Sequence, residues 1–356
     1  MDIFEATKSY ESWLGRHTSI VRPDLRLKHE RLAENPFVFL RGTFYRWIQQ
    51  WPDVCAKVAD APAVLSVGDL HIENFGTWRD AEGRLVWGVN DLDEACKLPY
   101  SHDLVRLAVS ALLAIGSRRL HISARDACEA ILEGYATSCE QGGRPLVLAE
   151  HHRWLRRLAL NDLRDPVEFW ARLLALRPAT TGAPRDALRS MMPNPELAYR
   201  VVRRVAGVGS LGRPRFVALA EWGGGLVARE AKAAVPSALG WVRRGGTRTS
   251  AAAWLLKQAI RVPDPFFAIR AGWVVRRLAP DCSRIELSEL PGRRDEQRLL
   301  SAMGWETANM HIGTNRAAIR ADLRRRPRRW LADAALRMAE AVRTDWRAWE
   351  RGRPGR

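Results

Sequence analysis

Two short apolar runs, each followed directly by polar residues, form the clearest pattern in the chain. Residues 63–67 are mostly apolar and lead into the polar cluster at 68–74, which contains Asp69, His71 and Asn74. Residues 85–89 are apolar and lead into a second cluster that contains Asp91 and Asp93. Apolar runs of this length, bounded by turn residues, are typical of strands. The pattern therefore predicts two strands that deliver carboxylates to one place.

The segment between these strands predicts a hairpin. Residues 74–78 have the composition of a strand, and 80–83 contain the Asp and Gly of a tight turn. A hairpin over 74–89 would bring Asp69, Asn74 and Asp91 together at one of its ends.

Helical periodicity surrounds this hairpin on both sides, and the segment 177–195 is richer in Pro, Gly and Thr, which is typical of a loop or linker. The predicted helices are 4–14, 24–33, a segment after Pro36, 103–117, 123–139, 149–160, 165–176, 295–311, 316–324 and 330–349.

A β-rich stretch lies between residues 201 and 280. Apolar runs at 216–220 and 226–232 flank the glycines at 223–225, which predicts a hairpin. A glycine-rich segment, 207–212, precedes it. A helix at 249–260 and strands at 266–269 and 273–278 complete the stretch.

Composition narrows the class of protein. The 356 residues carry a formal net charge of +17 and are 47% hydrophobic, enough for a sizeable core. Clustered cations favour nucleic acids through counterion release, but here the arginines are spread along the chain and interleaved with acids. The dense basic run 324–329 is interpreted as a solvated helix end. We therefore do not expect nucleic acid as a partner.

Cysteine usage and hydropathy indicate the compartment. The five cysteines form no C-x-x-C pair, which argues against a disulfide framework and a zinc site. No apolar run reaches the length of a membrane span, and the first residues are acidic where a signal peptide would be basic. A cytoplasmic protein without a membrane contact is expected.

The polar clusters suit phosphoryl transfer, which needs an aspartate near the acceptor hydroxyl, oxygen ligands for Mg²⁺ and a cradle for phosphates. Asp69 is the candidate base, Asn74 and Asp91 are candidate Mg²⁺ ligands, and Asp93 is an additional one. Backbone N–H groups of the segment 207–212 would cover the nucleotide phosphates, because glycine permits close approach.

His71 leaves two interpretations open. An Asp-x-His sequence after a strand also occurs in metal-dependent phosphoesterases, where the histidine binds metal. That class needs a later Asn-His pair and a second aspartate motif, and neither is found near the other histidines. We expect His71 to brace the loop.

These residues resemble a known group of enzymes. Residues 68–74 are similar to the catalytic loop of the aminoglycoside phosphotransferase and choline kinase branch of the protein-kinase-like superfamily. Residues 88–95 resemble its metal-binding segment, and 103–107 resemble the helix start, with Asp103, that steadies the catalytic loop. The chain looks closest to an uncharacterised bacterial family of kinase-like proteins, known as a domain of unknown function, in which 37–42 and 207–212 also have counterparts.

The resemblance implies a circularly permuted, two-lobed α+β fold. In ordinary kinases the glycine-rich loop precedes the catalytic loop, whereas here Gly207, Gly209, Ser210 and Gly212 lie far downstream of Asp69. Residues 1–200 would form a large helical lobe with the catalytic loop and the metal-binding hairpin. Residues 201–280 would form a small β-rich lobe, and 281–356 helices that return to the large lobe. Residues 304–311 resemble the helix that leads into the catalytic loop.

The resemblance also implies the function: an ATP- and Mg²⁺-dependent phosphotransferase acting on a hydroxyl of a small-molecule acceptor. Arg229 stands where the resembling families carry the lysine that holds the α and β phosphates. Lys232 would lie on the opposite face of a regular strand. Because 241–262 contains no acid to pair with that cation, a pseudokinase-like nucleotide-binding module is the alternative.

Overall fold

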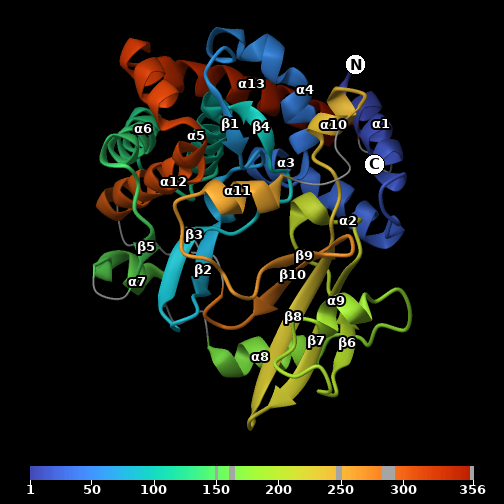
Figure 1. Cartoon of the computed structure of the whole chain (residues 1–356). Helices are drawn as coiled ribbons and strands as arrows, with labels where there is room; N and C mark the ends of the chain where they lie inside the picture. Colours follow the sequence, from blue (N-terminus) through green and yellow to red (C-terminus); the bar gives the residue numbers. More distant parts are fainter. Residues whose placement is uncertain (149–150, 160–164, 246–250, 283–292, 353–356) are drawn as a thin grey trace.

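The computed structural model describes residues 1–148, 151–159, 165–245, 251–282 and 293–352, and it has a mixed α+β architecture (Figure 1). The expected mixed class is confirmed. Parts of the predicted helices at 149–160 and 249–260, and of the basic tail, lie outside the described residues. Within the described residues, no helix combines the length and the apolar character needed to cross a membrane.

A helical body forms the upper part of Figure 1. Its first helix starts with a reciprocal capping box between Asp2 and Glu5, and α6 starts at the cap Ser123 and stops at Gly142, which has φ 92°. The body contains α1 (Ile3–Gly15), α2 (Arg22–Leu32), α3 (Pro36–Gly42), α4 (Phe44–Val54), α5 (Tyr100–Gly116), α6 (Ala124–Gln141), α7 (Arg153–Ala159), α12 (Arg293–Arg325) and α13 (Trp330–Arg351).

The helix α5 is the centre of this body. Every residue from Tyr100 to Ala114 is buried, and α6, α12 and α13 pack around it. α12 covers both predicted helices 295–311 and 316–324 as one element, with a non-helical backbone at Asn315. The helical geometry is therefore interrupted where the two predicted helices were expected to meet.

Two small sheets carry the predicted polar clusters. β1 (Ala63–Ser66) pairs antiparallel with β4 (Cys96–Pro99), a strand that the sequence pattern did not indicate. β2 (Phe75–Arg79) and β3 (Leu85–Val89) form the expected hairpin, with Phe75 opposite Val89, and β5 (Leu146–Val147) extends it.

A five-stranded antiparallel sheet of order β6-β7-β8-β10-β9 forms the lower part of Figure 1. Its strands are β6 (Arg200–Arg203), β7 (Arg215–Trp222), β8 (Gly225–Ala233), β9 (Ala268–Arg270) and β10 (Trp273–Leu278), and its connections include α10 (Leu239–Val242) and α11 (Ala252–Gln258). α11 packs on α12 and on β1, so this connection returns to the helical body.

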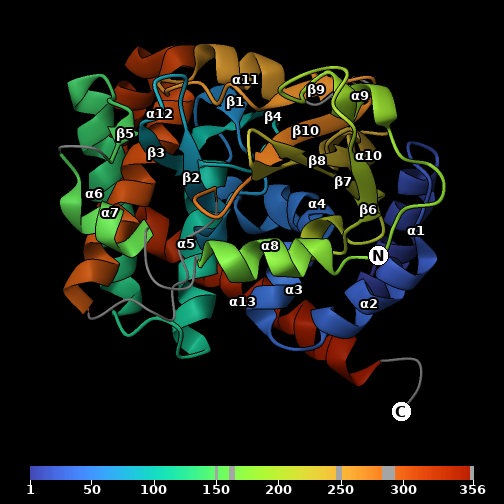
Figure 2. The ribbon, with the colours of Figure 1, turned by 90° about the horizontal axis from the view of Figure 1, so that it is seen from below.

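Alternation gives this sheet two distinct faces. The outer face buries apolar residues such as Phe216 and Ala231 against α9 (Arg185–Arg189) and its neighbours. The inner face is apolar at Val217 and Ala228, where α8 (Pro166–Leu174) covers it (Figure 2). It is charged at Arg215, Glu230, Lys232 and Arg276, at the end nearest the helical body. This charged end faces the polar clusters of β1–β3.

Candidate functional site

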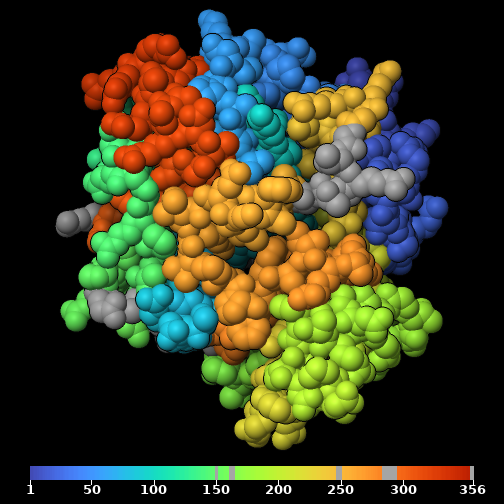
Figure 3. All heavy atoms as spheres, viewed as in Figure 1, coloured from blue at the N-terminus to red at the C-terminus, as the bar shows by residue number. Residues whose placement is uncertain are grey.

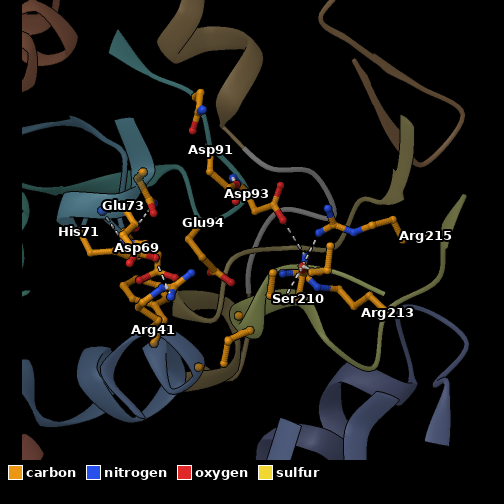
Figure 4. Close-up of a pocket in the computed structure, with 18 of the residues that line it drawn as sticks. Arg41, Asp69, His71, Glu73, Asp91, Asp93, Glu94, Ser210, Arg213 and Arg215 are labelled. Carbon is orange, nitrogen blue, oxygen red and sulfur yellow. Dashed lines mark hydrogen bonds and ion pairs between the residues drawn. The ribbon is translucent and has the colours of Figure 1, made fainter. Parts of the chain in front are cut away.

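A cavity of about 730 Å³ lies between the charged end of the inner face and the helical body (Figure 4). Its walls come from the loop 67–74, the segment 90–94, the glycine-rich segment and the end of β10. Parts of α1–α4 and α8 close its ends. The two polar clusters of the sequence therefore meet at one cavity.

One face of α5 holds the loop 67–74 in place. The Asp103 carboxylate accepts the backbone N–H of Val67 at 2.7 Å and of Gly68 at 3.0 Å, and Ser110 Oγ accepts the N–H of Ile72 at 3.0 Å. Arg106, between them on the same helical face, pairs with the Asp69 carboxylate. Helical spacing thus matches three anchors to successive positions of the loop.

Asp103 itself lies beneath the loop and is fully buried. Its carboxylate also contacts His311 Nε2 at 2.9 Å and His102 Nδ1 at 3.3 Å. Burial acts to raise the pKa of Asp103, but the two histidines outweigh it, and the pKa lies below its usual range. Asp103 therefore acts as a positioning residue for the loop and does not line the cavity.

Asp69 lines the cavity with one carboxylate oxygen fixed. Oδ1 accepts from Arg106 Nε at 2.8 Å, and a Cβ placed on Gly209 would lie 3.7 Å from Oδ2. Asn74 Nδ2 donates to the Asp69 backbone carbonyl at 2.6 Å. Burial raises the pKa of Asp69, although Arg106 opposes this effect. Asp69 thus lies between the α5 anchor and the glycine-rich segment.

Asp91 and Asp93 share a cation, Lys232. Lys232 Nζ lies 2.6 Å from Asp93 Oδ2 and 3.4 Å from Asp91 Oδ1, and Arg213 Nη1 lies 3.2 Å from Asp93 Oδ2. Burial acts to raise the pKa of Asp91, but Lys232 and neighbouring arginines hold it below its usual range. Asp91 is therefore ionised, and both carboxylates are directed toward Lys232 on the inner face of the sheet.

The donor set at Asp91 and Asp93 fits Mg²⁺, which is often held by one or two carboxylates together with substrate phosphates. Asn74 lies beside them, because the backbone N–H of Asn90 donates to the Asn74 carbonyl at 2.9 Å. Within the described residues, no group of three or more Asp, Glu, His or Cys side chains could hold a metal ion, so the candidate Mg²⁺ ligands here are two carboxylates.

The inner face adds arginines around a buried acid. Glu230 accepts from Arg276 Nε at 2.8 Å and pairs with Arg215 at 3.1 Å and with Arg204. Burial acts to raise the pKa of Glu230, but these cations, Arg215 first, hold it well below its usual value. Arg204, Arg215 and Arg276 all line the cavity, so its sheet side is positively charged.

Arg229, the expected phosphate cation, lies on the outer face instead. Its Nε donates to the Met191 carbonyl at 2.6 Å, and its guanidinium lies 4.6 Å from the centre of the Phe266 ring. Burial, and then Arg277, lowers the pKa of Arg229 to about 10. β8 is a regular strand, so positions 229 and 232 face opposite sides. Lys232, not Arg229, reaches Asp91.

The glycine-rich segment has the geometry that only glycine adopts easily. Gly207 has φ 75° and Gly212 has φ 94°, and a short 3₁₀ turn, Val208–Ser210, lies between them. Gly207, Gly209 and Ser210 line the cavity, whereas the Gly212 carbonyl accepts the N–H of Val21 at 2.8 Å. Three of the four predicted positions therefore reach the cavity.

His71 braces its own loop. Its Nδ1 accepts the N–H of Glu73 at 3.2 Å and so caps the turn Ile72–Asn74. Glu73 in turn pairs with Arg41 at 2.7 Å and with Arg119 at 3.2 Å. His71 lines the cavity beside Asp69.

Several residues in or beside the cavity were not predicted as site residues from the sequence. Burial raises the pKa of Glu94 to about 7, and its carboxylate accepts the N–H of Ala238 at 2.7 Å. Burial lowers the pKa of Lys28 to about 8, and its Nζ donates to the Gly209 carbonyl at 3.4 Å. Arg106 could have been found from its helical spacing to Asp103, but nothing local marks Lys28.

The sequence over residues 21–164 and 197–351 matches the family described as "Uncharacterized protein conserved in bacteria (DUF2252)". The stretch between the two matched regions contains α8 and α9. No curated protein and no solved structure matches the chain.

Proposed function

The chain belongs to the DUF2252 family, and we propose that it is an ATP- and Mg²⁺-dependent phosphotransferase that acts on a hydroxyl of a small-molecule acceptor. One observation carries the proposal: Asp69, the Asp91–Asp93–Lys232 cluster and the glycine-rich segment surround a single cavity. These are the parts that phosphoryl transfer requires.

In this proposal the sheet side of the cavity holds the nucleotide phosphates. Lys232 and Arg215 supply positive charge from the inner face, and the backbone N–H groups of Val208 and Gly209, in the glycine-rich segment that lines the cavity, would donate to the phosphates. The apolar end formed by Phe169 and Leu278 would receive the base. The cationic wall thus matches the charge of a polyphosphate.

Asp91 and Asp93 would hold Mg²⁺, with Asn74 beside them. When bound, Mg²⁺ supplies charge neutralisation to the β and γ phosphates. Lys232, which now contacts both carboxylates, would then turn toward the phosphates.

Asp69 would orient the acceptor hydroxyl. The acceptor oxygen forms a bond to the γ phosphorus, the bond between that phosphorus and the bridging oxygen breaks, and ADP leaves. The hydroxyl proton goes to Asp69, whose Oδ1 is held by Arg106. The raised pKa of Asp69 favours accepting that proton.

We also propose a circularly permuted, protein-kinase-like fold of two lobes. Residues 201–280 would be the small lobe, and 1–200 with 281–356 the large lobe. Two contacts support this order: α12, which follows the sheet in sequence, packs against β1 directly before the catalytic loop, and its His311 contacts Asp103.

The test is transfer of radioactive phosphate from γ-³²P-labelled ATP to a library of hydroxyl compounds. We expect a labelled acceptor and ADP that require Mg²⁺, and a rate at least 100-fold lower with Asp69→Asn. Parallel reactions with α-³²P-labelled ATP distinguish phosphoryl transfer from nucleotidyl transfer. Label on the acceptor together with release of pyrophosphate would mean nucleotidyl transfer and would contradict the proposal.

A second candidate is a nucleotide-binding module that does not transfer phosphate. It is favoured by the existing pairing of Asp91 and Asp93 with Lys232, which occupies the carboxylates that would hold Mg²⁺. ATP binding without turnover on any acceptor, and without an effect of Asp69→Asn, would select this candidate.

A further inference from the structure

A second pocket, of about 240 Å³, lies behind Asn90 and is separate from the nucleotide cavity. Its walls are β2, β3, the segment 256–267 and β10, and we call it the rear pocket. The space-filling view is hollowed between the segment around α11 and the segment around β9 and β10 (Figure 3). The rear pocket thus collects residues from three distant parts of the chain.

Two arginines stacked on aromatic rings line or border the rear pocket. The Arg261 guanidinium lies 4.4 Å from the centre of the Trp78 ring, and its Nη1 donates to the Val89 carbonyl at 3.0 Å. The Arg277 guanidinium lies 4.4 Å from the centre of the Phe266 ring. Stacking fixes the planes of both guanidinium groups.

The walls of the rear pocket are short of hydrogen-bond acceptors. Trp78 Nε1, Arg261 Nε, and both Nε and Nη2 of Arg277 are buried and have no hydrogen-bond partner among the described residues. Buried N–H groups in folded proteins are nearly always paired. Four such donors on side chains of one small pocket point to a ligand that brings acceptors.

Charge indicates the kind of ligand. Arg276 also lines the rear pocket, but its guanidinium pairs with Glu230 on the inner face. The other cations are Arg261, Arg277 and Arg229, which contacts the same Phe266 ring as Arg277. The acids beside them are Asp264, whose Oδ1 accepts the N–H of Phe266 at 2.9 Å, and Glu306, which accepts the N–H of Val89 while Arg261 donates to the carbonyl of Val89. Three cations and two carboxylates leave a surplus of one positive charge, which a monoanion would balance.

The rest of the lining is apolar, through Val89, Leu92, Leu256 and the rings of Trp78 and Phe267. We propose that the rear pocket binds a small organic carboxylate with an aromatic or apolar body. The carboxylate would accept from Arg261 and Arg277, and the body would lie against Trp78 and Phe267.

The rear pocket shares a wall with the nucleotide cavity. Asn90, Arg276 and Cys282 line both, and Arg276 holds Glu230 on the inner face. A carboxylate bound behind this wall would alter the affinity for Mg²⁺·ATP, and ATP would alter the affinity for the carboxylate by the same factor. This coupling rests on the proposed function, whereas binding of the carboxylate does not.

The first experiment measures binding of benzoate and of its neutral counterpart benzamide to the full chain by ligand-observed NMR. We expect saturable benzoate binding with a dissociation constant in the millimolar range for so small a ligand. Benzamide and the Arg277→Gln variant should each weaken binding at least tenfold. Arg270→Gln, an exposed arginine on β9, is the matched control and should bind benzoate as the wild type does.

Thermal unfolding of Arg277→Gln checks that the variant is folded. Trp78→Phe, which keeps a ring but removes the N–H, is a second variant, and its affinity for benzoate should fall severalfold. Equal binding of benzamide and benzoate, equal binding by the Arg277→Gln and Arg270→Gln variants, or no saturable binding would overturn the proposal. Tighter binding of phenyl phosphate than of benzoate would overturn the assignment of a monoanion.

The second experiment measures Mg²⁺·ATP affinity with and without saturating benzoate, and at least a threefold change is expected. An unchanged affinity would overturn the coupling. If no nucleotide binds at all, the proposed function fails while benzoate binding stands. If nucleotide binds and benzoate does not, the rear-pocket proposal alone fails.

Discussion

Lys232 is the residue whose removal should weaken nucleotide binding most directly. Its amine is buried and lies between Asp91 and Asp93, at the point where the phosphates would enter. Lys232→Met should lower the affinity for Mg²⁺·ATP at least tenfold, because a charge-assisted contact to phosphate is lost. Isothermal titration calorimetry measures this change.

Arg229→Met is the matched control for Lys232→Met. It removes a cation from the same strand, but from the outer face, where Arg229 contacts Met191 and Phe266. Its ATP affinity should equal that of the wild type. A larger loss in the Arg229 variant than in the Lys232 variant would contradict the assignment of the faces.

Glu306 should make stability depend on pH. The Glu306 carboxyl is buried against Gly88 and accepts the N–H of Val89 at 3.2 Å, and burial raises its pKa to about 6 from 4.5. The folded state therefore binds the proton more tightly than the unfolded state, so the free energy of unfolding falls as pH rises from 4.5 through about 6. The loss amounts to about 2 kcal/mol.

Urea unfolding across this pH range should show this fall in the free energy of unfolding in the wild type and not in Glu306→Gln. Glu133→Gln, an exposed position on α6, should keep it. Identical pH profiles for the wild type and Glu306→Gln would refute the assignment.

The sequence alone could not show whether Arg229 or Lys232 faces the cavity. Strand alternation correctly separates the two positions, but it does not say which face is inward. That choice depends on Asp91 and Met191, which approach β8 from distant parts of the chain. Asp69, Asn74 and Asp91, by contrast, follow strands that are close in sequence, so their meeting could be predicted.

At the scale of elements, α5 fixes the loop 67–74. Asp103→Asn should lower the free energy of unfolding by about 3 kcal/mol, because an amide cannot accept two backbone N–H bonds and also pair with His311. Urea unfolding measures the loss, and Asp126→Asn on the surface of α6 is the control. A loss equal to that of the control would show that α5 does not anchor the loop.

The strands and long helices were predictable because each carries its own periodicity, and α6 also begins at the cap Ser123. β4 and α9 were not indicated, since both are short and depend on partners: β4 on β1 and α9 on the outer face. The rear pocket could not be predicted from the sequence either, because Trp78, Arg261 and Arg277 are brought together only by tertiary packing.

The whole molecule brings its two ends together. The Phe4 ring stacks on the Trp349 ring with centres 5.4 Å apart, and both termini lie on the same side of Figure 1. The glycine-rich segment and the loop 67–74 meet at one cavity although they are far apart in sequence. The proposed circular permutation would account for both observations.

A rearranged chain should therefore fold. Joining residue 352 to residue 1 by a short Gly-Ser linker and opening the exposed loop between Thr181 and Gly182 would restore the element order of ordinary kinases. We expect cooperative unfolding and an ATP affinity within about threefold of the wild type, because few contacts cross that loop. A control opened between Leu70 and His71 should lose both properties. Failure of the 181/182 chain to fold would contradict the expected permutation.

Mg²⁺-dependent ATP binding at Asp91 is tested by a calorimetric titration of the wild type and Asp91→Asn with ATP, in the presence and absence of Mg²⁺. We expect one saturable site that needs Mg²⁺ and is weakened at least tenfold by Asp91→Asn. Absence of nucleotide binding with Mg²⁺, Mn²⁺ or Ca²⁺, or binding that is indifferent to both the metal and Asp91, would contradict it.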